Sequence, residues 1–187
     1  MLGYCFDDLI GKKVLIKGGV GSGKTRLTAD LLNQAMQKSP IGSITIIEMA
    51  PPKKIKQGKH IGGELLLPNG DHLPVIYLKP PKTWAPRLEG RTREGVIHLA
   101  KENANSIGLL LNAYLAKPTP ILFMNDLTIY LHAGRLRILL NAISAAATFI
   151  GNAYEGSFFE DMGSGISLRE KKFLRKVEEK MDRIITI

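Results

Sequence analysis

The chain has 187 residues, of which 44% are hydrophobic and 23% charged, a composition typical of a single globular domain with a sizeable core. Its formal net charge of +9 has three competing explanations: a surface that binds nucleic acid, attraction of anionic nucleotide substrates, or solubility alone, which is the commonest. No apolar run is long enough to span a bilayer, and a single Cys5 excludes an internal disulfide. Residues 1–8 have no basic segment ahead of an apolar one, so we expect no secretory signal there. We therefore expect a cytoplasmic protein without a membrane span.

The first predicted unit is a strand, a glycine-rich loop and a helix. Residues 14–16 form a short apolar strand, and residues 24–38 carry apolar side chains at helical spacing. The loop between them matches the pattern G-x-x-x-x-G-K-[ST] in full, with the residues Gly18, Gly19, Val20, Gly21, Ser22, Gly23, Lys24 and Thr25. Glycines let consecutive backbone N–H groups face one anion, and the helix N-terminus adds partial positive charge.

This loop predicts a nucleotide site that uses ATP and Mg²⁺. Lys24 is expected to reach the β- and γ-phosphates, and the Thr25 hydroxyl to bind Mg²⁺. We expect Arg26, the next residue, to belong to the same nucleotide site.

A second buried strand is predicted at 43–47, and Glu48 follows it before two prolines end the regular structure. A carboxylate at this point can orient or deprotonate an attacking water in a hydrolase, or accept the proton of a substrate hydroxyl in a kinase. Glu48 is therefore a candidate catalytic residue. The alternative is an ordinary surface glutamate at a strand end.

Residues 51–118 form an insertion that a minimal domain of this kind does not need. A β-hairpin is predicted from arms at 64–67 and 73–78 around an Asn-Gly turn at 68–71. Residues 80–87 are expected to be extended, and a long helix is predicted from about 92 to 115. We expect this insertion to contact a protein partner or a second substrate.

Positive charge is concentrated in the same region. Between residues 50 and 94, nine Lys and Arg residues stand against four Asp and Glu residues. Arg87, Arg91 and Arg93 are candidates for a substrate clamp or for stabilising a transferring phosphoryl group. Tyr77 and Trp84 could stack on bases if the region bound nucleic acid.

The remaining chain continues to alternate strands and helices. Strands are predicted at 121–124, 148–150 and 183–187, with helices at 134–146 and from about 167 to 181. A capping box formed by Ser167 and Glu170 is expected to open the last helix. The pattern predicts an α/β fold, a doubly wound and mainly parallel five-stranded sheet flanked by helices, within a single domain covering residues 1–187.

Ligands of such sheets bind at the carboxyl ends of the strands, where two further candidates lie. Asp126 follows the strand at 121–124 and is expected to hold Mg²⁺ beside Thr25. Asn152 follows the strand at 148–150 and is expected to contact the nucleotide, through either the γ-phosphate or the base. A turn-forming asparagine is the alternative reading of Asn152.

With these motifs the chain resembles the P-loop NTPase superfamily over roughly residues 12–39 and 120–187. The resemblance implies a nucleoside triphosphate ligand, with Asp126 ending the superfamily's second motif. Residues 151–154 lack the Asn-Lys-x-Asp pattern of guanine-specific GTPases, which favours ATP over GTP. No Glu follows Asp126, unlike the common pattern of motor ATPases.

Three functions compete at this point. The leading one is an ATP-binding protein with Mg²⁺-dependent ATPase activity or a nucleotide switch. The second is a small-molecule or nucleotide kinase in which Glu48 and the arginines of the insertion hold an acceptor. The third, less favoured, is a nucleic-acid-binding module regulated by nucleotide.

Overall fold

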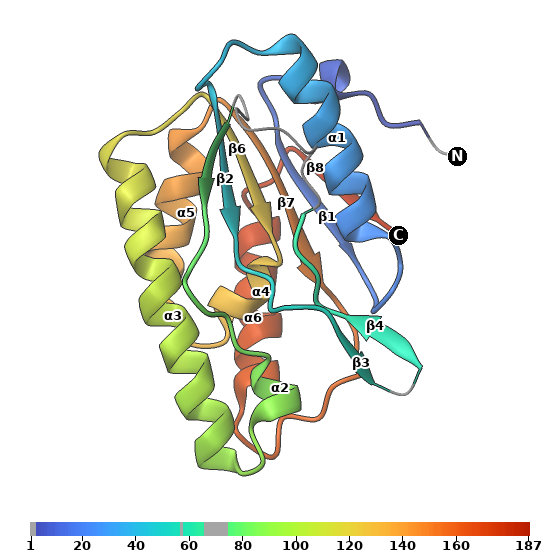
Figure 1. The fold of residues 1–187 in the computed structure, drawn as a ribbon, viewed down its shortest axis with the longest axis vertical. Coiled ribbons are helices and arrows are strands. Elements are labelled where there is room, and N and C mark those ends of the chain that lie inside the picture. Colours follow the sequence, from blue (N-terminus) through green and yellow to red (C-terminus); the bar gives the residue numbers. More distant parts are fainter. Residues whose placement is uncertain (1–2, 57, 66–74) are drawn as a thin grey trace.

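The computed structural model describes residues 3–56, 58–65 and 75–187. Its main element is a sheet of six strands in the order β5-β2-β6-β7-β1-β8, with every neighbouring pair parallel (Figure 1). The strands are β1 (Lys13–Gly18), β2 (Ile44–Glu48), β5 (Val75–Leu78), β6 (Ile121–Asn125), β7 (Thr148–Tyr154) and β8 (Arg183–Thr186). The α/β class and the mainly parallel sheet are confirmed, although the strand number of five was wrong.

Helices cover both faces of the sheet. One face packs against α1 (Lys24–Lys38) and the short 3₁₀ helix η1 (Phe6–Leu9). The other face packs against α3 (Arg93–Ala116), α4 (Leu127–Leu131), α5 (Leu136–Ala145) and α6 (Ile166–Glu178). Successive side chains of β6 point to opposite faces of the sheet. Leu122 and Met124 therefore pack in one hydrophobic cluster and Phe123 in the other.

The extra strand comes from the insertion. The predicted turn at 68–71 and the adjoining ends of both arms lie outside the described residues. The described part of the second arm, β5, does not follow the hairpin prediction: it pairs in parallel with β2 and extends the main sheet. Its Val75 and Tyr77 pack on the core that α1 covers. Local turn chemistry could not reveal that the edge of β2 was free to accept this strand.

The hairpin of the insertion lies earlier in the chain, where β3 (Lys54–Lys56) pairs antiparallel with β4 (Lys59–Ile61). Figure 1 shows this hairpin projecting from the carboxyl edge of the sheet. Residues 80–87, expected to be extended, end in the short helix α2 (Pro86–Glu89). The long helix is confirmed as α3, which Thr92 caps by accepting a hydrogen bond from the Gly95 N–H at 3.0 Å.

The predicted capping box of α6 is wrong. The helix begins at Ile166, so Ser167 lies inside its first turn, where its backbone N–H donates to the Asp161 carboxylate at 3.1 Å. Ser164 accepts from the Ile166 N–H at 3.4 Å. Glu170 is thereby left for a different role at the functional site. Within the described residues, no helix is both long and apolar enough to cross a membrane.

Two glycines that flank the buried Tyr130 ring test this packing. A Cβ on Gly134 would lie 2.5 Å from the ring, whereas the nearest atom to a Cβ on Gly108 is the Tyr130 hydroxyl at 3.9 Å. We expect Gly134→Ala to lower the free energy of unfolding by about 1–3 kcal/mol through overpacking. Gly108→Ala, inside α3, should raise it by about 0.5–1 kcal/mol. Urea unfolding followed by circular dichroism measures both, and equal effects would contradict the packing described.

Candidate nucleotide-binding site

The glycine-rich loop joins β1 to α1, as the sequence predicts. Gly21 and Gly23 adopt φ values of 72° and 98°, in the left-handed region that favours glycine. Gly23 is the N-cap of α1, and no side chain caps this end of the helix. The first-turn N–H groups of α1 are thus available to an anionic ligand.

Gly18 is required for a different reason. A Cβ there would lie 1.9 Å from the carbonyl oxygen of Ile187, at the end of β8. The first glycine of the motif therefore lets the edge strand approach the loop closely, whatever the loop binds.

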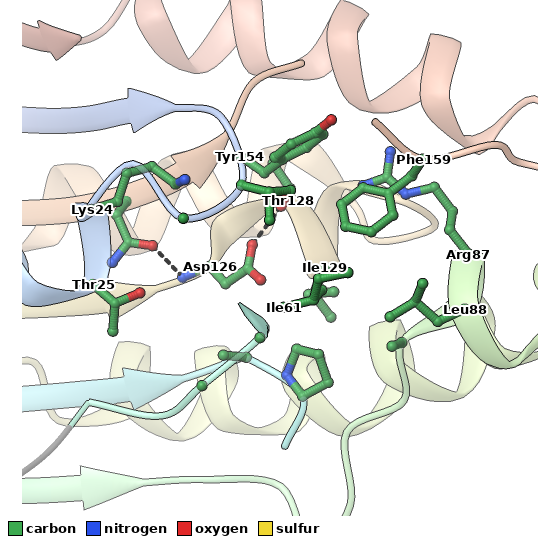
Figure 2. Close-up of a pocket in the computed structure, with 18 of the residues that line it drawn as sticks. Lys24, Thr25, Ile61, Arg87, Leu88, Asp126, Thr128, Ile129, Tyr154 and Phe159 are labelled. Carbon is green, nitrogen blue, oxygen red and sulfur yellow. Dashed lines mark hydrogen bonds between the residues drawn. The ribbon is translucent and has the colours of Figure 1, made fainter. Parts of the chain in front are cut away.

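The loop opens onto a cavity of about 280 Å³ at the carboxyl edge of the sheet (Figure 2). Residues 20–26 of the loop form one end, and Asp126 and Asn152 line the cavity beside them. The walls of the other end come from segments far apart in the sequence: Pro51, Ile61, Ala85, Pro86, Arg87, Leu88, Ile129, His132, Tyr154 and Phe159. A single cavity thus has a loop suited to phosphate at one end and mostly apolar walls at the other.

The opposite charges of Lys24 and Asp126 attract each other at the loop end of this cavity. The Lys24 ammonium donates to the Gly19 carbonyl at 2.5 Å, so it lies back along the loop. Burial lowers the pKa of Lys24, and the nearby Asp126 carboxylate opposes that shift. Figure 2 places Lys24, Thr25 and Asp126 at the same end of the cavity.

Asp126 is held in an unusual backbone conformation directly after β6. Its φ of 57° and ψ of 62° are left-handed, which turns the carboxylate into the cavity as α4 begins. Its N–H donates to the Asn152 side-chain oxygen at 2.9 Å, and the Thr128 hydroxyl donates to its carboxylate at 2.5 Å. Burial raises the pKa of Asp126, while the bond from Thr128 and the charge of Lys24 act against that shift.

A row of buried side-chain hydrogen bonds lies beneath these groups. The Asn152 amide donates to the Thr28 hydroxyl at 3.0 Å and to the Asn125 side-chain oxygen at 2.8 Å. The Asn125 amide in turn donates to the Glu48 carboxylate at 2.8 Å and to the Gly63 carbonyl at 3.0 Å. We call this set, Thr28, Asn152, Asn125 and Glu48, the strand-end relay.

The relay places two predicted site residues differently from expectation. Asn152 lies inside β7 rather than after it, fully buried, although it still lines the cavity. Glu48 is also fully buried and is not among the cavity-lining residues. Its carboxylate accepts from the Ala50 and Leu65 N–H groups, each at 2.8 Å, in addition to Asn125. Its catalytic role stays a prediction, and its observed contacts are with the framework.

The far end of the cavity contains a buried charge cluster that sequence reasoning found only in part. Arg87 forms two hydrogen bonds to the Glu170 carboxylate, at 2.7 and 3.3 Å, and its guanidinium lies 4.8 Å from the Phe159 ring centre. His132 Nε2 lies 2.6 Å from the same carboxylate, and its Nδ1 has no hydrogen-bond partner among the described residues. Burial lowers the pKa of His132, although the bond to Glu170 opposes this.

The partners in this cluster are separated by 38 and 83 residues, so no local pattern could have paired them. His132 and Glu170 were not predicted as site residues. Of the three candidate arginines, only Arg87 reaches the cavity, whereas Arg91 and Arg93 are exposed at the start of α3.

The aromatic candidates of the insertion do not form an open stacking surface. Trp84 is partly buried, with the Lys82 ammonium 3.3 Å from its ring centre and its backbone bonded to the Asn103 side chain. Tyr77 packs on the core.

The donor set at the loop fits magnesium better than zinc. Among the described residues, no group of three or more His, Cys, Asp or Glu side chains could hold a metal ion. Magnesium needs only one or two protein oxygens, since it keeps several waters and binds substrate phosphates. The Thr25 hydroxyl and the Asp126 carboxylate supply oxygens of this kind.

Comparison with known proteins adds little. No protein-family model matches the chain, and no curated protein does. Among solved structures, the crystal structure of Pif1 helicase from Candida albicans matches with a TM-score of 0.35 and 15% sequence identity. The match covers 96% of this chain but 36% of the helicase, so the chain spans about a third of that protein's length. A likeness this weak carries no argument about function.

The relay yields a pH-dependent prediction. Burial raises the pKa of Glu48 from an ordinary 4.5 to about 7, and the neighbouring Asp126 charge adds to the shift. Between pH 4.5 and 7 the folded protein keeps a proton on Glu48 that the unfolded chain has released. The contribution of this proton to the free energy of unfolding is therefore complete below about pH 4.5 and is lost as the pH rises to 7. In Glu48→Gln, which cannot ionise, this trend is absent.

We therefore expect the unfolding free energy of the unmodified protein, relative to Glu48→Gln, to fall by about 3 kcal/mol between pH 4.5 and 7. It should stay level above that range. Urea unfolding at several pH values measures the difference, with Glu102→Gln on the exposed face of α3 as the control. A difference that is constant with pH, or one that grows as the pH rises, would contradict the prediction.

Proposed function

We propose that the protein binds a nucleoside triphosphate with Mg²⁺ at the glycine-rich loop and hydrolyses it. The observation that carries this proposal is the convergence of Lys24, Thr25 and Asp126 at one end of a single cavity, from two segments about a hundred residues apart in sequence. The phosphates would displace the Gly19 carbonyl as the partner of the Lys24 ammonium. The Thr25 and Asp126 oxygens would hold the metal, which neutralises charge on the β- and γ-phosphates.

The strand-end relay supports the same assignment. Asn152 fixes the Asp126 backbone through a 2.9 Å bond and also binds Thr28 of α1, so the carboxylate and the first turn of α1 keep a fixed relative position. Phosphoryl transfer depends mainly on such positioning and on charge stabilisation. ATP is proposed over GTP, since residues 151–154 lack a guanine-recognition pattern.

Substitutions of Lys24 and Asp126 test the proposed binding of nucleotide and Mg²⁺. Lys24→Ala should abolish the rise in melting temperature that Mg²⁺-ATP produces in the unmodified protein, worth about 2.7 kcal/mol at a hundredfold excess over Kd. Asp126→Asn should retain ATP binding but lose its dependence on Mg²⁺, and phosphate release should fall by at least tenfold in both variants. Lys117→Ala, an exposed lysine that follows α3, is the control. Unchanged nucleotide binding in Lys24→Ala would refute the proposal.

One observation favours a second candidate, phosphoryl transfer to a bound acceptor. The cavity continues past Asp126 into a chamber with walls from Ile61, Leu88, Ile129 and Phe159. Arg87 lies on that wall with its charge balanced by Glu170. An acceptor with a largely apolar body and a hydroxyl group would fit this chamber beside the γ-phosphate.

Product analysis separates the two candidates. With a panel of hydroxyl-bearing small molecules, a kinase forms ADP without matching release of inorganic phosphate, whereas a hydrolase forms both in equal amounts. Ile129→Trp, which fills the chamber, should abolish any acceptor-dependent ADP while the thermal shift by Mg²⁺-ATP remains. Equal ADP and phosphate in every mixture would rule out the kinase.

A further inference from the structure

The outer face of α6 differs in charge from that of α3, the longest helix among the described residues. Its exposed residues after the first turn are all basic: Lys171, Lys172, Arg175 and Lys176. By contrast α3, which is longer, balances Arg93 and Lys101 with Glu94 and Glu102. We call the four exposed cations of α6 the basic face.

The acidic residues of α6 do not neutralise this face. Glu170 points inward to Arg87 and His132, and Glu178 bonds to Lys17 at 2.9 Å. Glu179, just beyond the helix, pairs with Lys176 at 2.9 Å. Across the described residues, Lys171, Lys172 and Arg175 have no ion-pair partner.

The cations form two adjacent rows, each one helical turn long. Lys171 lies four residues before Arg175, and Lys172 four residues before Lys176, a spacing of about 6 Å along the axis. Like charges at this spacing repel one another, which costs stability unless a polyanion occupies the face. Lys180, in the turn after α6, is also exposed.

We propose that the basic face of α6 binds the phosphodiester backbone of nucleic acid. Charge complementarity favours this occupant, since the face offers several unneutralised cations and no aromatic side chain that could read a base. A membrane surface fits less well, because an interfacial helix buries an apolar face in the lipid. The apolar side of α6 is already packed in the core through Leu174 and Val177, and Leu168 is its one exposed apolar residue.

The position of α6 gives the surface a connection to the cavity. Glu170, on the inward side of the first turns, holds Arg87 and His132 on the cavity wall. A nucleic-acid strand bound along α6 therefore lies on the outer side of a helix whose Glu170 holds two residues of the cavity wall, Arg87 and His132. Binding to the basic face itself does not depend on the proposed nucleotide hydrolysis.

Fluorescence anisotropy with labelled 30-residue oligo(dT), oligo(U) and a 30-base-pair duplex tests the proposal. The double variant Lys172→Glu with Arg175→Glu should weaken binding by at least tenfold. The slope of log Kd against log salt, about 3 to 4 for a patch of four cations, should fall by about 2. The control is Lys12→Glu with Lys117→Glu, two exposed lysines outside α6. Like the double variant, it lowers the net charge by 4, from +9 to +5.

The arms of this experiment identify the source of the phosphodiester. Tighter binding of oligo(U) than of oligo(dT) assigns the face to RNA, and the reverse assigns it to DNA. Lys24→Ala should bind the oligonucleotides as the unmodified protein does, which separates this surface from the nucleotide site. Equal losses in the two charge-reversed variants, no binding at all, or binding only to phosphatidylserine vesicles would overturn the proposal.

Discussion

The strand-end relay is the constraint on which the rest of the site depends. Thr28, Asn152, Asn125 and Glu48 link α1, β7, β6 and β2 through side-chain hydrogen bonds of 2.8 to 3.0 Å, in a fully buried layer. Buried amides and carboxylates are costly to leave unpaired, so each member fixes the position of the next. The layer adds side-chain bonds to the backbone pairing, which already reaches Glu48 and Asn125 at the ends of β2 and β6.

Asp126 depends on this layer directly. A left-handed conformation is unfavourable for a residue with a Cβ, and it persists where surrounding bonds fix it. The bond from its N–H to Asn152 and the bond that its carboxylate accepts from Thr128 do so here. Glu48 has a comparable role at the other end of the relay, where it accepts from the Leu65 N–H and so attaches the insertion to the sheet. The polar residues around the strand ends are thereby divided between those that line the cavity and those that hold the framework.

Sequence patterns predicted what is local and failed where distant segments meet. The glycine-rich loop, α1 and α3 follow from spacing within a short window, and Asp126 lies beside the loop as the strand-end rule requires. The parallel pairing of β5 with β2 and the Arg87–Glu170–His132 cluster depend on contacts between residues far apart in sequence. The spacing of Ser167 and Glu170 suits a capping box, but the partner of Glu170 is Arg87, a buried arginine from the insertion. Neighbouring sequence could not predict this pair.

That ion pair also explains how the insertion becomes part of the cavity. Arg87 and Glu170 are both nearly inaccessible, so separating them would leave a buried charge without a partner, at a cost of about 3–5 kcal/mol. The pair therefore holds α2 against the start of α6, and the cavity keeps a closed far wall. Because α6 carries Glu170 on one side and its exposed cations on the other, the helix that holds Arg87 and His132 on the cavity wall also presents the proposed basic face. A shift of α6 on binding at the basic face would move Glu170, and with it the Arg87 and His132 side chains that form the far wall of the cavity.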